Sequence, residues 1–213
     1  MQITAQRVRI ENGAYVFDLH YPDGILENLQ LSLPGRHNLF NAVAALGMAL
    51  SYGSPKEELV KALASYSGVI RRFTYRIQKE DMVLIDDYAH HPTEIAAVHQ
   101  SVREMYPEES VLAIFQPHLF SRTKDFMSDF AVALSHFDEV ALLDIYPARE
   151  EPIAGITSEV LLSKMTLSRK QIIQKNELTD LVKGINHKIV VMMGAGDIGV
   201  EILKVTKELR GEG

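Results

Sequence analysis

The most constraining feature of the sequence is a regular alternation of short apolar runs with helix-like segments, which begins after Gly68. The apolar runs predict strands at residues 82–86, 111–116, 139–145, 171–173 and 188–193. Helices are expected to begin near Pro92, Arg122, Ser158, Glu177 and Asp197. Alternating strands and helices imply an α/β fold, a Rossmann-like and mostly parallel sheet with helices on both faces. Ligands of such sheets bind beyond the carboxyl ends of the strands, so the loops there should carry the function.

The first 68 residues follow a different pattern, which predicts a small α+β unit. Polar and apolar residues alternate around the turn formers Asn12-Gly13 and Asp23-Gly24, as in hairpin strands. From Asn38 onward the spacing is helical, and one apolar face holds Leu39, Val43, Leu46 and Leu50. The change of pattern places a domain boundary close to Gly68, so we expect one domain at 1–68 and another at 69–213.

A second helix is expected to start at the sequence SPKE. Ser54 would be its N-cap, Pro55 would take the first helical position, and Glu57 would close a capping box. The apolar face of this helix would then include Leu59 and Leu63, followed by Tyr66.

Composition limits the classes of function. The residues are 46% hydrophobic and 23% charged, and no apolar run approaches the ~20 residues of a membrane span, so a cytoplasmic protein without a membrane partner is the simplest interpretation. The absence of cysteine excludes disulfides, thiolate metal sites and a cysteine nucleophile. A net charge of -6 argues against a nucleic-acid partner, so anions must be bound by a local site.

The densest polar cluster is DDYAHHPTE, residues 86–94, which follows an apolar strand and opens a helix at Pro92. Its carboxylates and imidazoles fall beside a helix N-terminus, where unpaired N–H groups favour anions such as the phosphates of ATP. Alternatively, Asp86 satisfies turn amides and His91 caps the helix. Zinc is a weaker interpretation of the adjacent histidines, because neighbours in an extended strand point to opposite sides and the i, i+4 spacing is absent.

Two further segments bring basic residues to the predicted edge. The loop QPHLFSRTK, residues 116–124, places Arg122 near a helix start, where a guanidinium suits a carboxylate or phosphate, although solvated first-turn residues would look the same. Arg71 and Arg72 lie just past the boundary and either reach a cleft between domains or are surface charge. Asn38 is either the N-cap of its helix or an amide that reads an adenine edge.

The segment GAGDIG, residues 194–199, matches G-x-G-x-x-G between an apolar run and a helix, which is the form of a dinucleotide fingerprint. It lies in the last strand–helix unit, however, whereas the fingerprint belongs to a first unit with further strands after it. A tight turn that lines a substrate cleft is therefore the preferred interpretation. No glycine begins the phosphate-binding pattern G-x-x-x-x-G-K-[ST].

The segments GRHNLFNAVAA, GVIRRFTYR, DDYAHHPTE, QPHLFSRT and GAGDIG occur in the order typical of the Mur ligases, and the chain resembles that family from about Leu33 to Gly199. The resemblance is greatest to the members that join L-alanine to UDP-N-acetylmuramate. It implies that 1–68 is the end of the central ATPase domain and that 69–213 is the family's Rossmann-like C-terminal domain. It also implies that an N-terminal uridine-nucleotide domain and the rest of the ATPase domain, about 240 residues with the phosphate loop, are missing.

The same resemblance implies residue roles. Asn38 and His37 resemble the adenine contacts, and Arg72 resembles the residue that reaches the terminal phosphates. Asp87 corresponds to the ribose ligand and His90 lies near the phosphates, so Arg72 and His90 are the implied catalytic pair. The substrate-binding set is Tyr88, which lines the acceptor pocket, with His118 and Arg122, which hold substrate carboxylates. Leu119 stands where some relatives have a further arginine.

The implied activity is ATP-dependent amide formation for peptidoglycan synthesis. ATP phosphorylates the lactyl carboxylate of UDP-N-acetylmuramate, and L-alanine then displaces phosphate from the acyl phosphate. Mg²⁺ would be held mainly by the missing part, so no metal ligand is assigned here, and the isolated chain should be inactive. Three alternatives stay open: a recycling ligase that attaches a preformed peptide, an NAD-binding oxidoreductase that uses GAGDIG, and a non-catalytic binding module.

Overall fold

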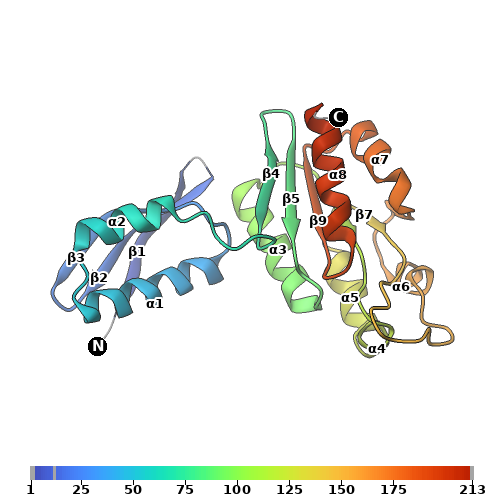
Figure 1. Cartoon of the computed structure of the whole chain (residues 1–213), viewed down its shortest axis with the longest axis horizontal. Coiled ribbons are helices and arrows are strands. Elements are labelled where there is room, and N and C mark those ends of the chain that lie inside the picture. Colours follow the sequence, from blue (N-terminus) through green and yellow to red (C-terminus); the bar gives the residue numbers. More distant parts are fainter. Residues whose placement is uncertain (1–2, 12, 212–213) are drawn as a thin grey trace. The chain divides into compact units, whose positions relative to one another are not determined.

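The computed structural model describes residues 3–11 and 13–211, which fall into two compact units (Figure 1). Unit 1 takes the described residues up to Val69 together with Gln100–Pro107, and unit 2 takes Ile70–His99 and the described residues from Glu108 onward. Asn12, in the first predicted turn, lies outside the described residues. None of the helices in the described part combines the length and apolar content that crossing a bilayer requires.

Unit 1 is an antiparallel sheet of three strands covered by two helices. The strands are β1 (Thr4–Glu11), β2 (Ala14–Tyr21) and β3 (Gly24–Leu31), in the order β1-β2-β3, as two hairpins predict. The helices are α1 (Arg36–Tyr52) and α2 (Lys56–Ser65). Their buried residues Leu39, Leu46 and Leu63 share one core with strand residues such as Phe17 and Leu29. The predicted inward face of α1 is thereby confirmed.

The predicted helix starts in unit 1 are wrong by one to three residues. Pro55 rather than Ser54 is the N-cap of α2; it has an extended ψ of 132°, and no side chain caps the helix. The first helical hydrogen bond therefore runs from the Leu59 amide to the Pro55 carbonyl. In α1 the N-cap is Gly35, so Asn38 lies inside the first turn, and its side-chain amide donates to the Pro34 carbonyl at 2.7 Å.

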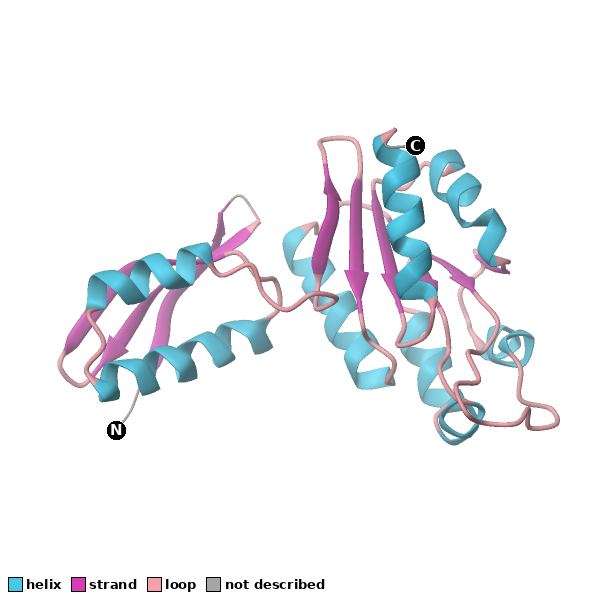
Figure 2. Cartoon of the chain, viewed as in Figure 1, coloured by secondary structure: helices cyan, strands magenta, loops and turns pink. Residues whose placement is uncertain are grey.

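Unit 2 has the predicted architecture, a mostly parallel six-stranded sheet between two layers of helices (Figure 2). The strands are β4 (Thr74–Gln78), β5 (Val83–Asp87), β6 (Val111–Phe115), β7 (Glu139–Leu142), β8 (Lys170–Ile172) and β9 (Ile189–Met193). Their order is β4-β5-β9-β6-β7-β8, and every neighbouring pair except β4 and β5 is parallel. Strands β5, β6 and β9 are buried along their whole length, which is why β6 and β9 are continuous apolar runs and β5 is apolar up to its two terminal aspartates.

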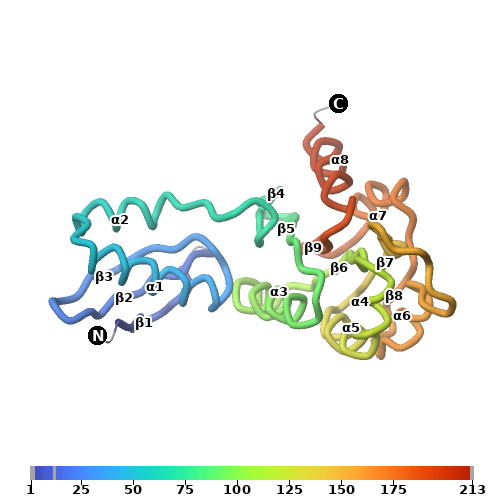
Figure 3. The backbone as a smooth tube through the Cα atoms, turned by 60° about the horizontal axis from the view of Figure 1, so that its bottom comes forward, coloured from blue at the N-terminus to red at the C-terminus, as the bar shows by residue number. Residues whose placement is uncertain are grey.

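The helices follow the strands in chain order. They are α3 (Pro92–Met105), α4 (Phe120–Asp125), α5 (Met127–Leu134), α6 (Ser158–Lys164), the 3-10 turn η1 (Lys175–Glu177), α7 (Leu178–Gly184) and α8 (Ile198–Arg210). Helices α7 and α8 cover one face of the sheet, and α3 and α5 cover the other, as both the front and the tilted views show (Figure 3).

Each face of the sheet has its own core. On the α7 and α8 face, Leu112 and Val190 pack with Val182, Ile202 and their neighbours. On the opposite face the ring of Phe115 lies 5.6 Å from that of Phe130, between centroids. Because side chains alternate along a strand, each central strand contributes apolar residues to both cores. The sheet is therefore a rigid support for the loops at its carboxyl edge.

Candidate functional site

The polar segments of the sequence meet at the carboxyl edge of three adjacent strands. Strand β9 pairs in parallel with both β5 and β6, so the loops that begin at Tyr88, Gly194 and Gln116 leave the sheet side by side. The close approach of distant segments at this edge brings together most of the residues predicted from the sequence.

Asp87 is a buried carboxylate that organises the turn after β5. One of its oxygens accepts from the Phe73 amide and the other from the Ala89 amide, both at 2.7 Å. Burial raises the pKa of Asp87 to about 6, against the opposing effect of these two amides and of Arg72. The turn amides that the sequence interpretation gave to Asp86 are thus bound by Asp87.

Asp86 instead holds two arginines. Its oxygens lie 3.1 Å from Nε of Arg71 and 2.7 Å from Nη2 of Arg76, and its side chain is 1% exposed. A buried carboxylate with two guanidinium partners keeps its negative charge compensated. Arg72, the next residue along, is 56% exposed, and its nearest acid is Glu94 at 3.9 Å.

The two adjacent histidines turn in different directions. Nδ1 of His90 lies 2.9 Å from the Tyr88 carbonyl, which can only accept, so in a neutral ring Nδ1 carries the proton and Nε2 is the acceptor. The Nδ1 atom of His91 faces the Thr93 hydroxyl at 2.9 Å. Among the described residues, no group of histidine and acidic side chains is arranged to hold a metal ion. Nδ1 of His91 also accepts from the Thr93 amide at 3.3 Å, so His91 binds a first-turn amide of α3, as the capping interpretation proposed.

His118 and Arg122 lie together after β6. Nη1 of Arg122 is 3.4 Å from Nδ1 of His118, and since arginine cannot accept, Nδ1 is the acceptor and the ring proton lies on Nε2. Burial, followed by the charge of Arg122, lowers the pKa of His118, which favours this neutral form. The rings of His90 and His118 are 6.2 Å apart, between centroids, so the loops after β5 and β6 present their imidazoles to each other.

The loop after β7 is held against these residues. The ring of Tyr146 stacks on His118 with centroids 5.6 Å apart, and its carbonyl accepts from the Leu119 amide at 2.9 Å. Further along, the carboxylate of Glu150 accepts from both the amide and the hydroxyl of Ser121, at the start of α4. Residues 146–150 are therefore docked onto the loop that carries Arg122.

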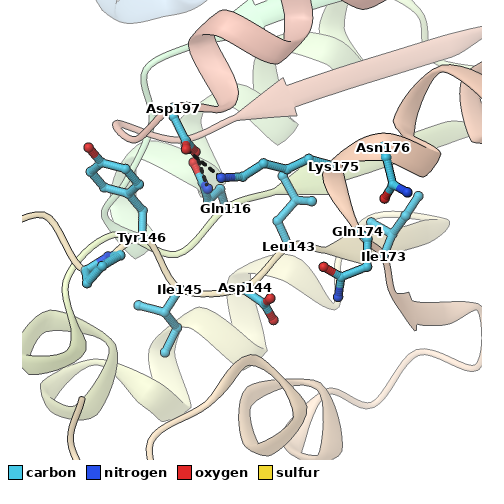
Figure 4. A pocket seen from close by; sticks show the side chains of 11 residues that line it. Gln116, Leu143, Asp144, Ile145, Tyr146, Ile173, Gln174, Lys175, Asn176 and Asp197 are labelled. Carbon is cyan, nitrogen blue, oxygen red and sulfur yellow. Dashed lines mark hydrogen bonds and ion pairs between the residues drawn. The ribbon is translucent and has the colours of Figure 1, made fainter. Parts of the chain in front are cut away.

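A pocket of about 450 Å³ opens beside this docked segment, at the carboxyl ends of β6, β7, β8 and β9 (Figure 4). Lys175 approaches Asp197 across it at 2.5 Å, and the amide of Gln116 donates to Asp197 at 2.7 Å. The loops after β6 and β7 lead to one face of the sheet and those after β8 and β9 to the other, so the pocket lies where the direction of the connections changes.

The glycine turn after β9 is filled by side chains of the chain itself. A Cβ on Gly196 would lie 2.5 Å from Oε1 of Gln116 and 2.7 Å from the Tyr146 ring, and one on Gly199 would lie 2.5 Å from the Arg71 guanidinium. The glycines thus permit close packing of three other segments of the chain.

Comparison with known proteins relates this geometry to a family. A sequence model described as "Mur ligase, glutamate ligase domain" matches residues 71–198, more than half of the chain. The chain belongs to the Mur ligase family. It is 60% identical over 206 residues to a UDP-N-acetylmuramate--L-alanine ligase of Christiangramia forsetii, and the match covers 97% of this chain and 46% of that relative.

Solved structures share the Mur ligase fold. A UDP-N-acetylmuramate-alanine ligase from Thermotoga maritima matches with a TM-score of 0.79 and 24% identity, over 99% of this chain and 46% of that one. A folylpolyglutamate synthase from Mycobacterium tuberculosis, complexed with ADP, matches with a TM-score of 0.72 and 16% identity, over 95% and 47%. The chain therefore spans about half the length of the relatives it matches.

The magnesium that the family resemblance implies fits the described residues poorly, because they form no cluster of acidic side chains arranged for a metal ion and Asp86 is committed to two arginines. Mg²⁺ prefers carboxylates and phosphate oxygens with open coordination positions.

Sequence reasoning also assigned no role to several residues that the structure places at this edge. They are Gln116, Glu150, Lys175 and Asp197. Their partners lie 22 to 82 residues away in the chain, so only their positions after strands could have suggested them.

Proposed function

We propose that this chain is the C-terminal part of an ATP-dependent ligase that joins L-alanine to UDP-N-acetylmuramate through an acyl phosphate, in peptidoglycan synthesis. The observation that carries the proposal is the convergence of His90, His118 and Arg122 after β5 and β6, the two strands that flank β9, in a chain 60% identical to a relative of that name. The use of ATP favours a cytoplasmic location.

The acidic substrate groups are proposed to bind at His118 and Arg122. With its proton on Nε2, neutral His118 offers one donor, and the guanidinium of Arg122 offers several more in a fixed plane. Two such donors suit a carboxylate or an acyl phosphate, whose negative charge must be held while it reacts. Tyr88, 37% exposed beside His90, is proposed to line the pocket for the amino acid that attacks.

The nucleotide is proposed to bind at Asp87, Arg72 and His90. Each oxygen of Asp87 accepts one amide and retains a second lone pair, which suits a ribose hydroxyl donor. Arg72 is exposed and only loosely paired, so it is able to turn toward the terminal phosphates of ATP. In the assembled enzyme His37 and Asn38 would contact the adenine.

The proposed reaction has two steps. A carboxylate oxygen of the lactyl group attacks the terminal phosphorus of ATP, and ADP leaves. The amine of L-alanine next attacks the acyl carbon, the C–O bond to phosphate breaks, and the nitrogen loses a proton as the amide forms. Nε2 of His90, the acceptor atom of the neutral ring, is proposed to receive a proton or a hydrogen bond in this second step. Arg72 stabilises the charge on the transferred phosphoryl group.

Protein outside this chain is proposed to complete the site and to cover α1. The aromatic and apolar residues Phe40, Met48 and Tyr52 follow one another at intervals of eight and four positions on this helix and are 67%, 70% and 91% exposed. A helix that is apolar on the face opposite its core is normally covered by other protein. The missing partner is proposed to be the remainder of the ATPase domain, which carries the phosphate loop and the ligands of Mg²⁺.

A chimeric enzyme tests this proposal. The N-terminal part of the Christiangramia forsetii relative, up to its match with this chain, is joined to residues 1–213. We expect phosphate release from ATP that requires both UDP-N-acetylmuramate and L-alanine. The variant Arg122→Met should lose about 10- to 100-fold in kcat/KM, as expected for a hydrogen bond to a charged group. Lys124→Met, on the same short helix, is the matched control and should retain activity.

Two results would overturn the assignment. A folded chimera that releases no substrate-dependent phosphate would remove the ligase activity from this chain. A strong preference for a tripeptide over L-alanine as acceptor would instead identify the recycling ligase.

A further inference from the structure

Arg71 has a backbone conformation that arginine rarely adopts. Its φ is +63°, in the left-handed region that favours glycine. Such a conformation persists where the surrounding contacts determine it. Here the Arg71 amide donates to the Thr74 hydroxyl at 3.0 Å, and its carbonyl accepts from the Tyr88 amide at 2.8 Å. The backbone of Arg71 is thus tied to the residue proposed to line the acceptor pocket.

The side chain of Arg71 joins three structures at the carboxyl edge of the sheet. Nε donates to Asp86 at 3.1 Å, Nη2 donates to the Gly194 carbonyl at 2.5 Å, and the guanidinium carbon lies 5.0 Å from the centre of the Tyr88 ring. The last distance is that of a cation–π contact. Only 19% of the side chain is exposed, so these contacts occur with little competition from water.

The glycine turn provides the space for this arrangement. A Cβ on Gly199 would lie 2.5 Å from Nη1 and 2.6 Å from Cζ of Arg71, closer than side-chain atoms approach each other. The guanidinium of Arg71 therefore packs directly against Gly199, the last glycine of GAGDIG.

The Tyr88 ring is held on two sides and open on the remainder. Arg71 lies over it, and His90 meets it edge to face, with centroids 5.3 Å apart and planes at 80°. The ring is nevertheless 37% exposed, enough to contact a ligand. Without Arg71 the ring would keep only one of its two supports and would be free to rotate away from a ligand.

We propose that Arg71 is a positioning residue for the amino-acid acceptor: it fixes the Tyr88 ring by clamping it to Asp86 and to the Gly194–Gly199 turn. This inference rests on the proposed ligase function and adds a residue to it that does not itself touch substrate. The neighbouring Arg72 serves the nucleotide, so the two consecutive arginines have separate tasks.

Arg76 supplies a matched control. It donates to the second oxygen of Asp86 from both Nε and Nη2, at 3.1 Å and 2.7 Å. Asp86 is the partner that the two arginines have in common. The contacts with the Tyr88 ring and with the Gly194 carbonyl belong to Arg71. Since Arg76 continues to compensate Asp86 when Arg71 is replaced, Arg71→Met should fold, whereas Arg76→Met tests the loss of an ion pair alone.

The first experiment measures steady-state kinetics in the chimera. Arg71→Met should raise the KM for L-alanine about tenfold, which is in the upper part of the range for a partly buried cation–π contact. The KM values for ATP and UDP-N-acetylmuramate should change less than about twofold. Arg71→Lys should recover part of the loss. Gly199→Ala should act like Arg71→Met, because it displaces the guanidinium without removing it. Arg76→Met should leave the KM for L-alanine unchanged. An unchanged KM in both Arg71→Met and Gly199→Ala would overturn the proposal.

The second experiment uses the 213-residue chain alone, so that it decides the question even if the chimera shows no ligase activity. Ring-current shifts from Tyr88 should displace the Nε–H resonance of Arg71, and Tyr88→Leu or Gly199→Ala should abolish the displacement. A resonance that neither substitution moves would show that Arg71 does not hold the ring. Failure of the proposed function is seen separately, as an unsubstituted chimera without activity.

Discussion

Replacement of Asp87 by asparagine tests the strongest electrostatic feature of the site. Burial raises the pKa of this carboxyl from its ordinary value of 3.8 to about 6, although two backbone amides favour its charged form. The substitution Asp87→Asn would keep the size of the side chain and remove the titration. The difference in stability between the two proteins therefore isolates the cost of burying the charge.

The magnitude follows from the change in pKa. A shift of about two units, at ~1.36 kcal/mol per unit, corresponds to about 3 kcal/mol. Because the folded-state pKa is the higher one, the folded chain binds the proton more tightly. The stabilising contribution is complete below pH 3.8 and is lost as the pH rises through 6. Relative to Asp87→Asn, the unsubstituted chain should thus become less stable by about 3 kcal/mol between about pH 4 and pH 7.

The assay is urea unfolding of both proteins at several pH values across this window, with the carboxyl carbon of Asp87 followed by NMR. Asp144→Asn, at an exposed position after β7, controls for the loss of one negative charge. A stability difference between Asp87→Asn and the unsubstituted chain that does not vary with pH would refute the reasoning. So would a carboxyl that titrates at or below its ordinary value.

Three further predictions concern other parts of the chain. Hydrogen bonds from Ser121, at the start of α4, lower the pKa of Glu150, so the stability that this carboxylate contributes is present above about pH 4.5 and is lost as the pH falls. Glu150→Gln should therefore speed amide exchange in the docked loop at neutral pH, and equal exchange rates would contradict this. Serine at Phe40, Met48 and Tyr52 should reduce self-association of the isolated chain in sedimentation, with little change in Tm. Phe130→Ala, in the core, should cost about 3–5 kcal/mol by urea unfolding; a loss below about 1 kcal/mol would contradict the packing.

The parallel strands could be predicted because a strand that is buried on both faces of the sheet is apolar at consecutive positions. Strand β9, IVVMM, has no polar position, and such a run of five is short for a helix. Strand β4, TYRIQ, has no such run and was missed. It is an edge strand whose Arg76 faces Asp86, and a charged residue in a short segment is typical of a loop.

The site could be predicted in position but not in pairing. The sequence placed Asp86 and Asp87 correctly at the end of β5, but the alternative interpretation gave the turn amides to Asp86, and it is Asp87 that binds them. Adjacent residues of a strand point to opposite faces of the sheet, so the two carboxylates had to have different partners. Which one faces which depends on the register of β4 against β5, where Thr74 pairs with Asp86. That register follows from tertiary packing and has no local signature.

The glycine turn shows why a motif needs its surroundings. Its spacing equals that of a dinucleotide fingerprint, in which glycines allow a backbone to approach a pyrophosphate. Here the same absence of side chains admits Gln116 and Tyr146 at Gly196 and the guanidinium of Arg71 at Gly199. Glycine at these positions indicates that another group approaches the backbone closely, but only the fold identifies that group. In this chain the side chains that approach come from the loops after β6 and β7 and from the segment before β4, so all three segments pack against the same turn.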